Sequence, residues 1–193
     1  MTIKLIVGLG NPGKNYKYHR HNVGFWFCDA LAKLYTVNFK KRTKFFGEVT
    51  QINIFNHKIQ LLKPTTFMNC SGQSIQSIAN FYQINADEIL IVHDELNINP
   101  GIAKIKSGGG HCGHNGLRNT IKILETKAFH RLRIGIGHPG NKLQIVNFVL
   151  STPSKDELEK IQNALNDSLQ VIEDLIKNNL NKVIKTLQKK EII

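Results

Sequence analysis

The chain has 193 residues, enough to bury a substantial core without disulfide or metal support, and we expect one domain over residues 1–193. No apolar run approaches the length of a membrane-spanning helix, and the amino terminus lacks the apolar stretch and cleavage site of a signal peptide. Three widely spaced cysteines without a CxxC pair suit a reducing compartment, so we expect a cytoplasmic protein that does not act at membranes.

Positive charge is unevenly distributed along the chain. Residues 1–150 contain 19 lysines and arginines against 7 acidic residues, whereas residues 151–193 contain 7 of each. All of the excess positive charge therefore lies in the part that also holds the polar motifs. A basic surface next to a site predicts a polyanionic substrate, most simply a nucleic acid. The alternative is a lysine-rich composition without functional meaning.

The first predicted element is a buried strand over residues 3–7, which ends in the glycine-rich sequence GLGNPGKN. This sequence matches the dinucleotide-binding pattern GxGxxG and nearly matches a phosphate-binding P-loop. Both motifs need a helix that starts at the last glycine, and here Pro12 and a polar run as far as His21 delay the helix. The glycines instead predict a tight turn that exposes Asn11.

The polar segment YKYHRHNVG, residues 16–24, follows this turn and precedes an apolar helix predicted from Asn22 to Tyr35. It contains two histidines, an arginine, two tyrosines and an asparagine. Loops that are held by a rigid element carry much of the chemistry of globular enzymes. We therefore predict that His21 is the base of a hydrolase and that the other polar segments converge on it.

A basic loop is predicted at residues 40–44, followed by two strands, 48–55 and 58–62, that form a hairpin through Asn56-His57. The next helix carries apolar residues from position 75 onwards, and Asn69 and Ser71 lie at its amino-terminal end. Side chains of these types at a helix start either cap the helix or bind a substrate.

A buried strand at residues 89–92 ends in the sequence HDEL, beyond a strand end where α/β proteins gather ligand groups. Asp94 in this sequence is either the partner that orients a histidine or a plain surface carboxylate. Residues 102–106 alternate like a strand and place Lys104 and Lys106 on one face.

The sequence GGGHCGHNGLRN at residues 108–119 then opens a helix, with a backbone that can approach a ligand closely. Its two histidines, His111 and His114, have no second pair at a spacing typical of zinc sites, so we expect no metal. A strand at 131–137 presents two arginines on one face, and an amphipathic helix runs from Ser154 to Ile176 before an interruption at Asn178-Asn179.

Six motifs in order, GLGNPG, RHNVG, PTTFMN, HDEL, GGGHCGHNGLRN and FHRLRIGIGHPG, make the chain resemble the bacterial peptidyl-tRNA hydrolases. The resemblance extends from Ile3 to the carboxyl-terminal helices. The residues that depart from the family pattern beside these motifs are His19, Cys70 and Cys112. The resemblance implies an α/β fold with three layers, α/β/α, in which helices flank a twisted mixed β-sheet. It also implies a monomer that needs no cofactor and cleaves the ester between a peptide and the 3′ end of tRNA.

The resemblance also assigns roles to residues. His21 would activate water, and Asp94 would fix the histidine tautomer and stabilise the imidazolium. The residues implied in substrate binding are Asn11, Tyr16, Asn69 and Asn115. The residues implied in binding a tRNA phosphate are Lys104, Lys106 and Arg133.

Two alternatives from other functional classes remain at this stage. A non-catalytic RNA-binding module would need the basic surface, but not His21, Asp94 and the asparagines together. A nucleotide-dependent oxidoreductase would need the glycine-rich turn to bind a dinucleotide.

Overall fold

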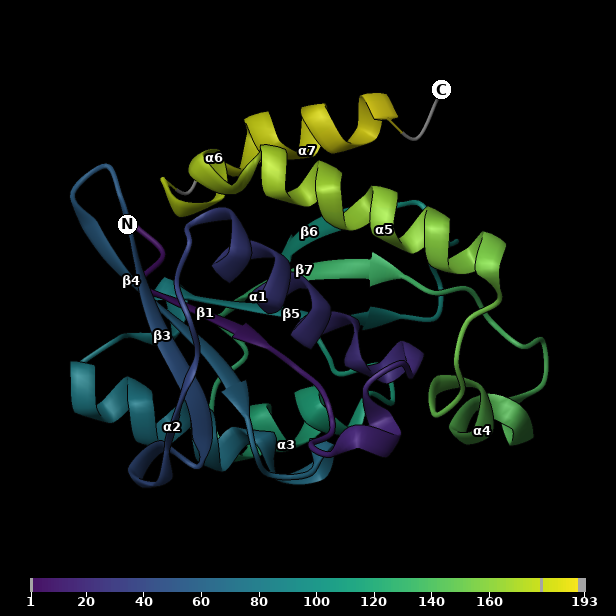
Figure 1. Cartoon of the computed structure of the whole chain (residues 1–193), viewed down its shortest axis with the longest axis horizontal. Coiled ribbons are helices and arrows are strands. Elements are labelled where there is room, and N and C mark those ends of the chain that lie inside the picture. The colour runs from purple at the N-terminus through teal and green to yellow at the C-terminus, as the bar shows by residue number, and fades with distance from the viewer. Residues whose placement is uncertain (1, 178, 191–193) are drawn as a thin grey trace.

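A seven-stranded mixed β-sheet with helices on both faces organises the computed structural model, which describes residues 2–177 and 179–190 (Figure 1). This is the three-layer α/β/α arrangement that the family resemblance implies. The strands are β1 (Leu5–Gly8), β2 (Lys40–Arg42), β3 (Gly47–Ile54), β4 (His57–Pro64), β5 (Ile89–Glu95), β6 (Ala103–Ser107) and β7 (His130–Gly135). Their order across the sheet is β2-β3-β4-β1-β5-β7-β6.

The four central strands β4, β1, β5 and β7 run parallel, and β3 and β6 flank them in the antiparallel direction. Because parallel strands end at the same edge, the segments that follow β1, β4 and β5 emerge side by side there. This edge is where the polar motifs of the sequence are gathered.

Helices α1, α5, α6 and α7 cover one face of the sheet, and α2 and α3 cover the other (Figure 1). The helices are α1 (Val23–Leu34), α2 (Ser71–Tyr82), α3 (Asn115–Leu124), α4 (Ile145–Val149), α5 (Lys155–Gln170), α6 (Ile172–Ile176) and α7 (Leu180–Lys190). Short 3-10 turns are η1 (Lys14–Tyr16), η2 (Arg20–Asn22), η3 (Thr43–Phe45), η4 (Met68–Cys70), η5 (Ala86–Glu88) and η6 (Lys142–Gln144). None of the helices within the described residues is long and apolar enough to cross a membrane.

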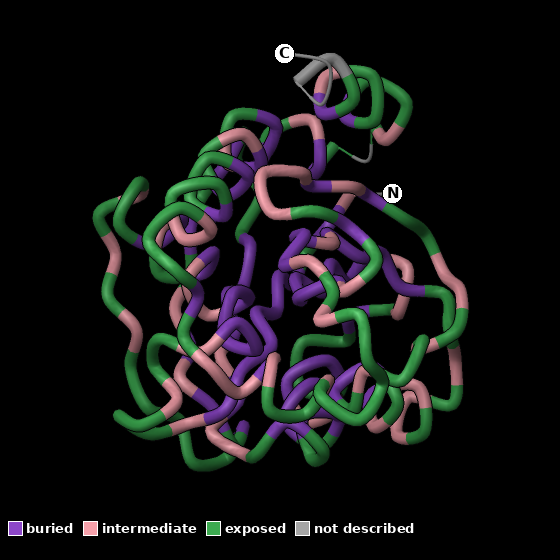
Figure 2. Tube along the Cα trace, turned by 90° about the vertical axis from the view of Figure 1, so that its right-hand side faces the viewer, coloured by how far each residue is buried: buried purple, intermediate pink, exposed green. Residues whose placement is uncertain are grey.

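The core has two halves because strand side chains alternate between the two faces. Ile6 of β1 packs with α1 and α5, whereas Leu5 and Val7 on the opposite face pack with α2 and α3. Figure 2 shows the buried residues concentrated in the middle of the molecule, with exposed residues around them.

Three local predictions are corrected by the structure. Residues 40–42 form the edge strand β2 rather than a loop, because their backbone pairs with β3 while every side chain stays exposed. The β3–β4 hairpin is confirmed, but its turn is Phe55-Asn56, both with positive φ. The long carboxyl-terminal helix is broken at Val171, and Asn178 lies outside the described residues.

Candidate active site

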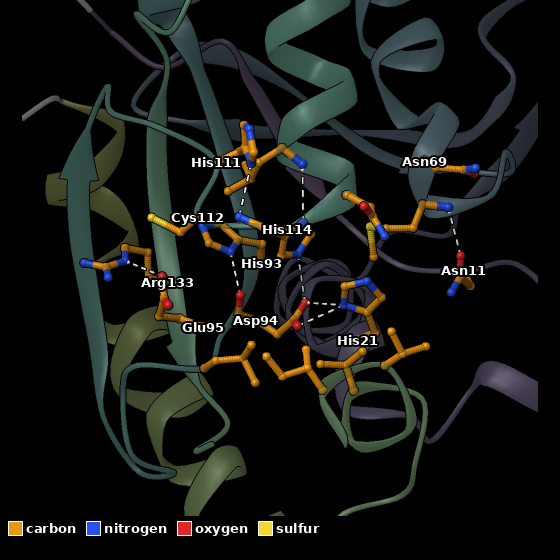
Figure 3. Close-up of a pocket in the computed structure, with 18 of the residues that line it drawn as sticks. Asn11, His21, Asn69, His93, Asp94, Glu95, His111, Cys112, His114 and Arg133 are labelled. Atoms are coloured by element: carbon orange, nitrogen blue, oxygen red, sulfur yellow. Dashed lines mark hydrogen bonds and ion pairs between the residues drawn. The ribbon is translucent and has the colours of Figure 1, made fainter. Parts of the chain in front are cut away.

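A cavity of about 480 Å³ lies beyond the carboxyl ends of β1 and β5. Figure 3 shows side chains from separate segments pointing into it. The predicted site residues that line it are Asn11, Tyr16, His21, Asn69, Asp94, Lys106, Asn115 and Arg133. Lys104 is the predicted site residue that does not line this cavity, although it lies directly opposite Arg133 in the β6–β7 register.

His21 and Asp94 are in direct contact. The Nδ1 atom of His21 lies 2.9 Å from both carboxylate oxygens of Asp94. Both side chains are buried, and they come from η2 and the end of β5, 73 positions apart in sequence. An ionised carboxylate only accepts hydrogen bonds, so Nδ1 carries the proton and Nε2 keeps its lone pair. In Figure 3 the Nε2 atom points away from Asp94, towards the side where Asn11 and Asn69 lie.

The pKa values of this pair are shifted in opposite directions. Burial alone would raise the pKa of Asp94, but the adjacent His21 and His114 imidazoles reverse this effect and hold it well below its usual range. Burial alone would lower the pKa of His21, but the charge and hydrogen bond of Asp94 outweigh it, so the His21 pKa is raised. The carboxylate is therefore ionised, and the histidine is a stronger base than an isolated imidazole.

His114 is a third member of this network that the sequence reasoning missed. Its Nε2 lies 3.0 Å from Oδ1 of Asp94. Its Nδ1 accepts the backbone N–H groups of Gly116 (3.1 Å) and Leu117 (3.3 Å), so the side chain caps α3. Because Nδ1 is an acceptor, Nε2 must carry the proton and donate it to Asp94. The sequence did place His114 immediately before a predicted helix start, a position typical of a helix cap. From the sequence we considered His114 only as a zinc ligand.

The side chains of His21, Asp94 and His114 are also close enough to be considered as a metal site, because one ligand atom from each lies within 4.8 Å of the others. However, the nitrogen that each histidine turns to Asp94 carries a hydrogen. A cation there would have to displace the Nε2 proton of His114, which the N–H groups of α3 keep in place. The donor set therefore fits a hydrogen-bonded network better than a metal centre.

The prediction that the glycine-rich turn exposes Asn11 is wrong, since Asn11 is only 7% exposed. Its Oδ1 accepts the backbone N–H of Met68 at 2.8 Å. Its own backbone N–H and C=O pair with the side chain of Asn22. These bonds hold the β1 turn against η2 and η4, and they leave the Nδ2 group of Asn11 as the donor that can serve the cavity.

The other two asparagines lie on the rim of the cavity. Asn69 is exposed in η4, and neither it nor Ser71 caps α2, because the Ser71 hydroxyl donates to the carbonyl of Met68 instead. The capping alternative for Asn69 and Ser71 is therefore wrong. Asn115 is the first residue of α3, and its Oδ1 accepts from Arg118 at 3.1 Å. Because neither Asn69 nor Asn115 caps a helix, both side chains are available to bind a substrate.

Arg133 and Arg131 lie on one face of β7, as predicted, but differ in role. Arg133 donates from Nε to Glu95 at 3.0 Å, and Figure 3 shows its terminal nitrogens directed away from this bond. Arg131 is buried and donates to the carbonyls of Gly109 and Gly110. It therefore holds the glycine-rich loop beside the site, a role that charge alone does not reveal.

Arg20 joins the loop that carries His21 to α4, which forms one wall of the cavity. Its side chain is buried, and its guanidinium group stacks on the ring of Phe148 at 4.2 Å. Its hydrogen-bond acceptors are the carbonyls of Phe148, Ser151 and Thr152, the hydroxyl of Ser151, and the carboxylate of Glu157. The positive charge of Arg20 also interacts favourably with the helix dipole at the carboxyl-terminal end of α4.

The chain is similar over its whole length to known proteins. The sequence model of the family described as "Peptidyl-tRNA hydrolase" matches residues 5–193. A peptidyl-tRNA hydrolase of Vesicomyosocius okutanii is 93% identical over 193 residues, which is 100% of both chains. One from Pectobacterium atrosepticum is 49% identical over 187 residues, 96% of each chain. The crystal structure of the Acinetobacter baumannii peptidyl-tRNA hydrolase superimposes with a TM-score of 0.93 at 44% identity, covering 96% of this chain and 94% of that one.

Proposed function

This chain belongs to the peptidyl-tRNA hydrolase family, and we propose from its geometry which residues carry out the hydrolysis of peptidyl-tRNA. The observation that carries this proposal is the contact between His21 Nδ1 and both oxygens of Asp94, each at 2.9 Å. It leaves Nε2 unprotonated at the wall of a cavity that also holds amide donors and cations.

His21 acts as the general base. Its Nε2 removes a proton from water, which attacks the carbonyl carbon of the ester between the peptide and the tRNA ribose. When the resulting tetrahedral intermediate collapses, the bond between that carbon and the ribose oxygen breaks, and the ribose oxygen takes the proton from His21 Nε2. Asp94 keeps the proton on Nδ1 before the reaction and stabilises the imidazolium that forms during it. His114 donates to the same carboxylate and keeps Asp94 turned towards His21, so it acts as a positioning residue.

The amide side chains stabilise the attacked carbonyl group. Attack by water turns the carbonyl oxygen into an oxyanion, which N–H donors on the opposite side of the cavity bind more tightly than the neutral carbonyl. The Nδ2 group of Asn11 is suited to this role because its Oδ1 is already fixed by Met68. Asn69 and Asn115 are exposed donors on the rim that hold the peptide amide groups. One such oxyanion donor contributes about 3–4 kcal/mol of transition-state stabilisation.

The tRNA lies on the side of β6 and β7. Lys106 and Arg133 line the cavity there and bind a phosphate of the tRNA, and Lys104 lies outside the cavity on the same sheet face. Glu95 holds the Arg133 guanidinium through Nε, which leaves the terminal nitrogens as a fork for phosphate oxygens. The enzyme acts as a monomer in the cytoplasm, because this cavity is formed within one chain and its substrate comes from translation.

The test is hydrolysis of N-acetyl-aminoacyl-tRNA by the wild-type protein and by His21→Ala. The rate with His21→Ala should fall by roughly 10²–10⁴-fold, while binding of tRNA persists. The matched control is His57→Ala, since His57 is an exposed histidine of the β3–β4 hairpin. A His21→Ala enzyme that keeps more than about a tenth of the wild-type rate would refute the assignment of the base. No turnover by the wild type would favour a non-catalytic RNA-binding module instead.

A further inference from the structure

We propose that a second groove, between α1 and α5, binds the peptide part of the substrate beyond its first residues. This α1–α5 groove has a volume of about 820 Å³ and shares Asn11 with the catalytic cavity. Residues that line it include Tyr18, Phe25, Trp26, Leu158 and Gln162. The inference rests on the proposed function, because it extends the path of the same substrate away from His21.

The surface of the groove is suited to an uncharged, largely apolar chain. The rings of Phe25 and Trp26 are half-buried, and Tyr18 is 61% exposed beside them. The indole Nε1 of Trp26 donates to the carbonyl of Lys17 at 2.8 Å, so the aromatic face rather than the N–H is offered to a ligand. Aromatic and aliphatic side chains of this kind bind peptides of varied sequence through their apolar parts.

The charged side chains at one end of the groove are already paired. Lys63 contacts Asp29 at 2.7 Å and Glu48 at 3.0 Å. This internal ion-pair cluster leaves no unpaired acid to repel a peptide and takes Lys63 out of use as an anion-binding group. Two exposed lysines, Lys14 and Lys17, also line the groove, so charge alone does not separate a peptide from a tRNA there. The aromatic and aliphatic walls of the groove are the feature that favours the peptide.

The strand order gives the substrate a direction. The phosphate-binding cations come from β6 and β7, the catalytic carboxylate from β5, and Lys63 and Pro64 of the groove from the end of β4. The order β4-β1-β5-β7-β6 thus puts the cations and the groove on opposite sides of the catalytic pair. A substrate whose tRNA lies over β7 must extend its peptide towards β1 and β4.

The reach of the peptide follows from strand geometry. Two strand spacings separate β5 from β4, which is about 10 Å at roughly 4.8 Å per strand. An extended peptide covers about 3.3 Å per residue. The β4 end of the groove is therefore reached from about the third residue onwards, so a single acylated amino acid is too short to extend along it.

The experiment compares two substrates on the same tRNA, an N-acetyl-aminoacyl group and a peptide of about six residues. In the variant Gln162→Trp, an exposed groove residue of α5 becomes a bulky side chain that obstructs part of the groove. We expect kcat/KM on the long substrate to fall about tenfold, the equivalent of burying about 55 Å² less apolar surface. The rate on the short substrate should stay within about twofold. The matched control is Asn163→Trp, on an exposed neighbour in α5 outside the groove.

A second measurement uses Trp26, which is the single tryptophan of the chain and lies in the groove. With His21→Ala to prevent hydrolysis, the long peptidyl-tRNA should protect Trp26 from acrylamide quenching, whereas N-acetyl-aminoacyl-tRNA should not. Equal protection by both substrates would show that the groove binds tRNA and would overturn the proposal. Equal rate losses on both substrates in Gln162→Trp, or no loss on either, would also overturn it. Failure of the proposed function is distinct, because then the wild-type enzyme would hydrolyse neither substrate.

Discussion

Replacing Asp94 by Asn should do more than remove a charge, because it should reverse the tautomer of His21. Both carboxylate oxygens lie 2.9 Å from His21 Nδ1, and Oδ1 also accepts from His114 at 3.0 Å. The proton on His114 Nε2 is fixed by the N–H groups of α3, so the amide oxygen of the variant must face His114. The amide NH₂ group then faces His21 and donates to Nδ1. The proton of His21 moves to Nε2, which can no longer accept one from water.

The Asp94→Asn variant should lose the full contribution of the general base, which is about 10²–10⁴-fold in rate, or roughly 3–5 kcal/mol of activation free energy. The pH profile should change as well. Asp94 raises the pKa of His21, and hydrolysis needs the unprotonated base, so the wild-type rate should rise with pH through an inflection above the ordinary histidine value. Removing the charge of Asp94 should move that inflection to lower pH.

The assay is single-turnover hydrolysis of N-acetyl-aminoacyl-tRNA between about pH 5 and pH 9, where a histidine titrates. Asp156→Asn is the matched control, since Asp156 is an exposed carboxylate that pairs with Lys160 on α5. A loss below about tenfold, or an inflection that does not move, would refute the reasoning that Asp94 sets the His21 tautomer.

Three further predictions concern the surroundings of the His21–Asp94 pair. Lys106→Ala and Arg133→Ala should weaken tRNA binding more than they slow hydrolysis. Each should also reduce the slope of log affinity for tRNA against log salt concentration by somewhat under one unit. An unchanged slope together with a collapsed kcat would instead show that these residues act in the chemical step. Arg20→Ala should lower the melting temperature by roughly 5–10 °C and raise KM, because it leaves carbonyls of the α4–α5 connection unpaired. Calorimetry measures the melting temperature, and Arg20→Lys should restore part of the loss. Asn69→Ala or Asn115→Ala should narrow the rate ratio of acylated to free aminoacyl-tRNA, because only the acylated form offers an amide to pair with; equal losses on both substrates would contradict it.

The sequence by itself determined the main elements and most members of the site. The run before Gly8, the apolar spacing of α1 and the HDEL segment at the end of β5 each carry a local signal of strand or helix. Polar residues just beyond such elements are where α/β proteins place ligand groups. Their positions beside these elements made His21 and Asp94 candidates, and the family resemblance implied that they are partners although 73 positions separate them.

Only the tertiary structure decided what each polar side chain does. The sequence assigned no role to His114 once zinc was set aside, but its two ring nitrogens join a helix start to Asp94. Asn11 looked exposed, but it is buried because Met68, from a distant segment, needs an acceptor. Residue type determines which hydrogen bonds a side chain is able to make. Packing between segments far apart in the chain determines which partner it has.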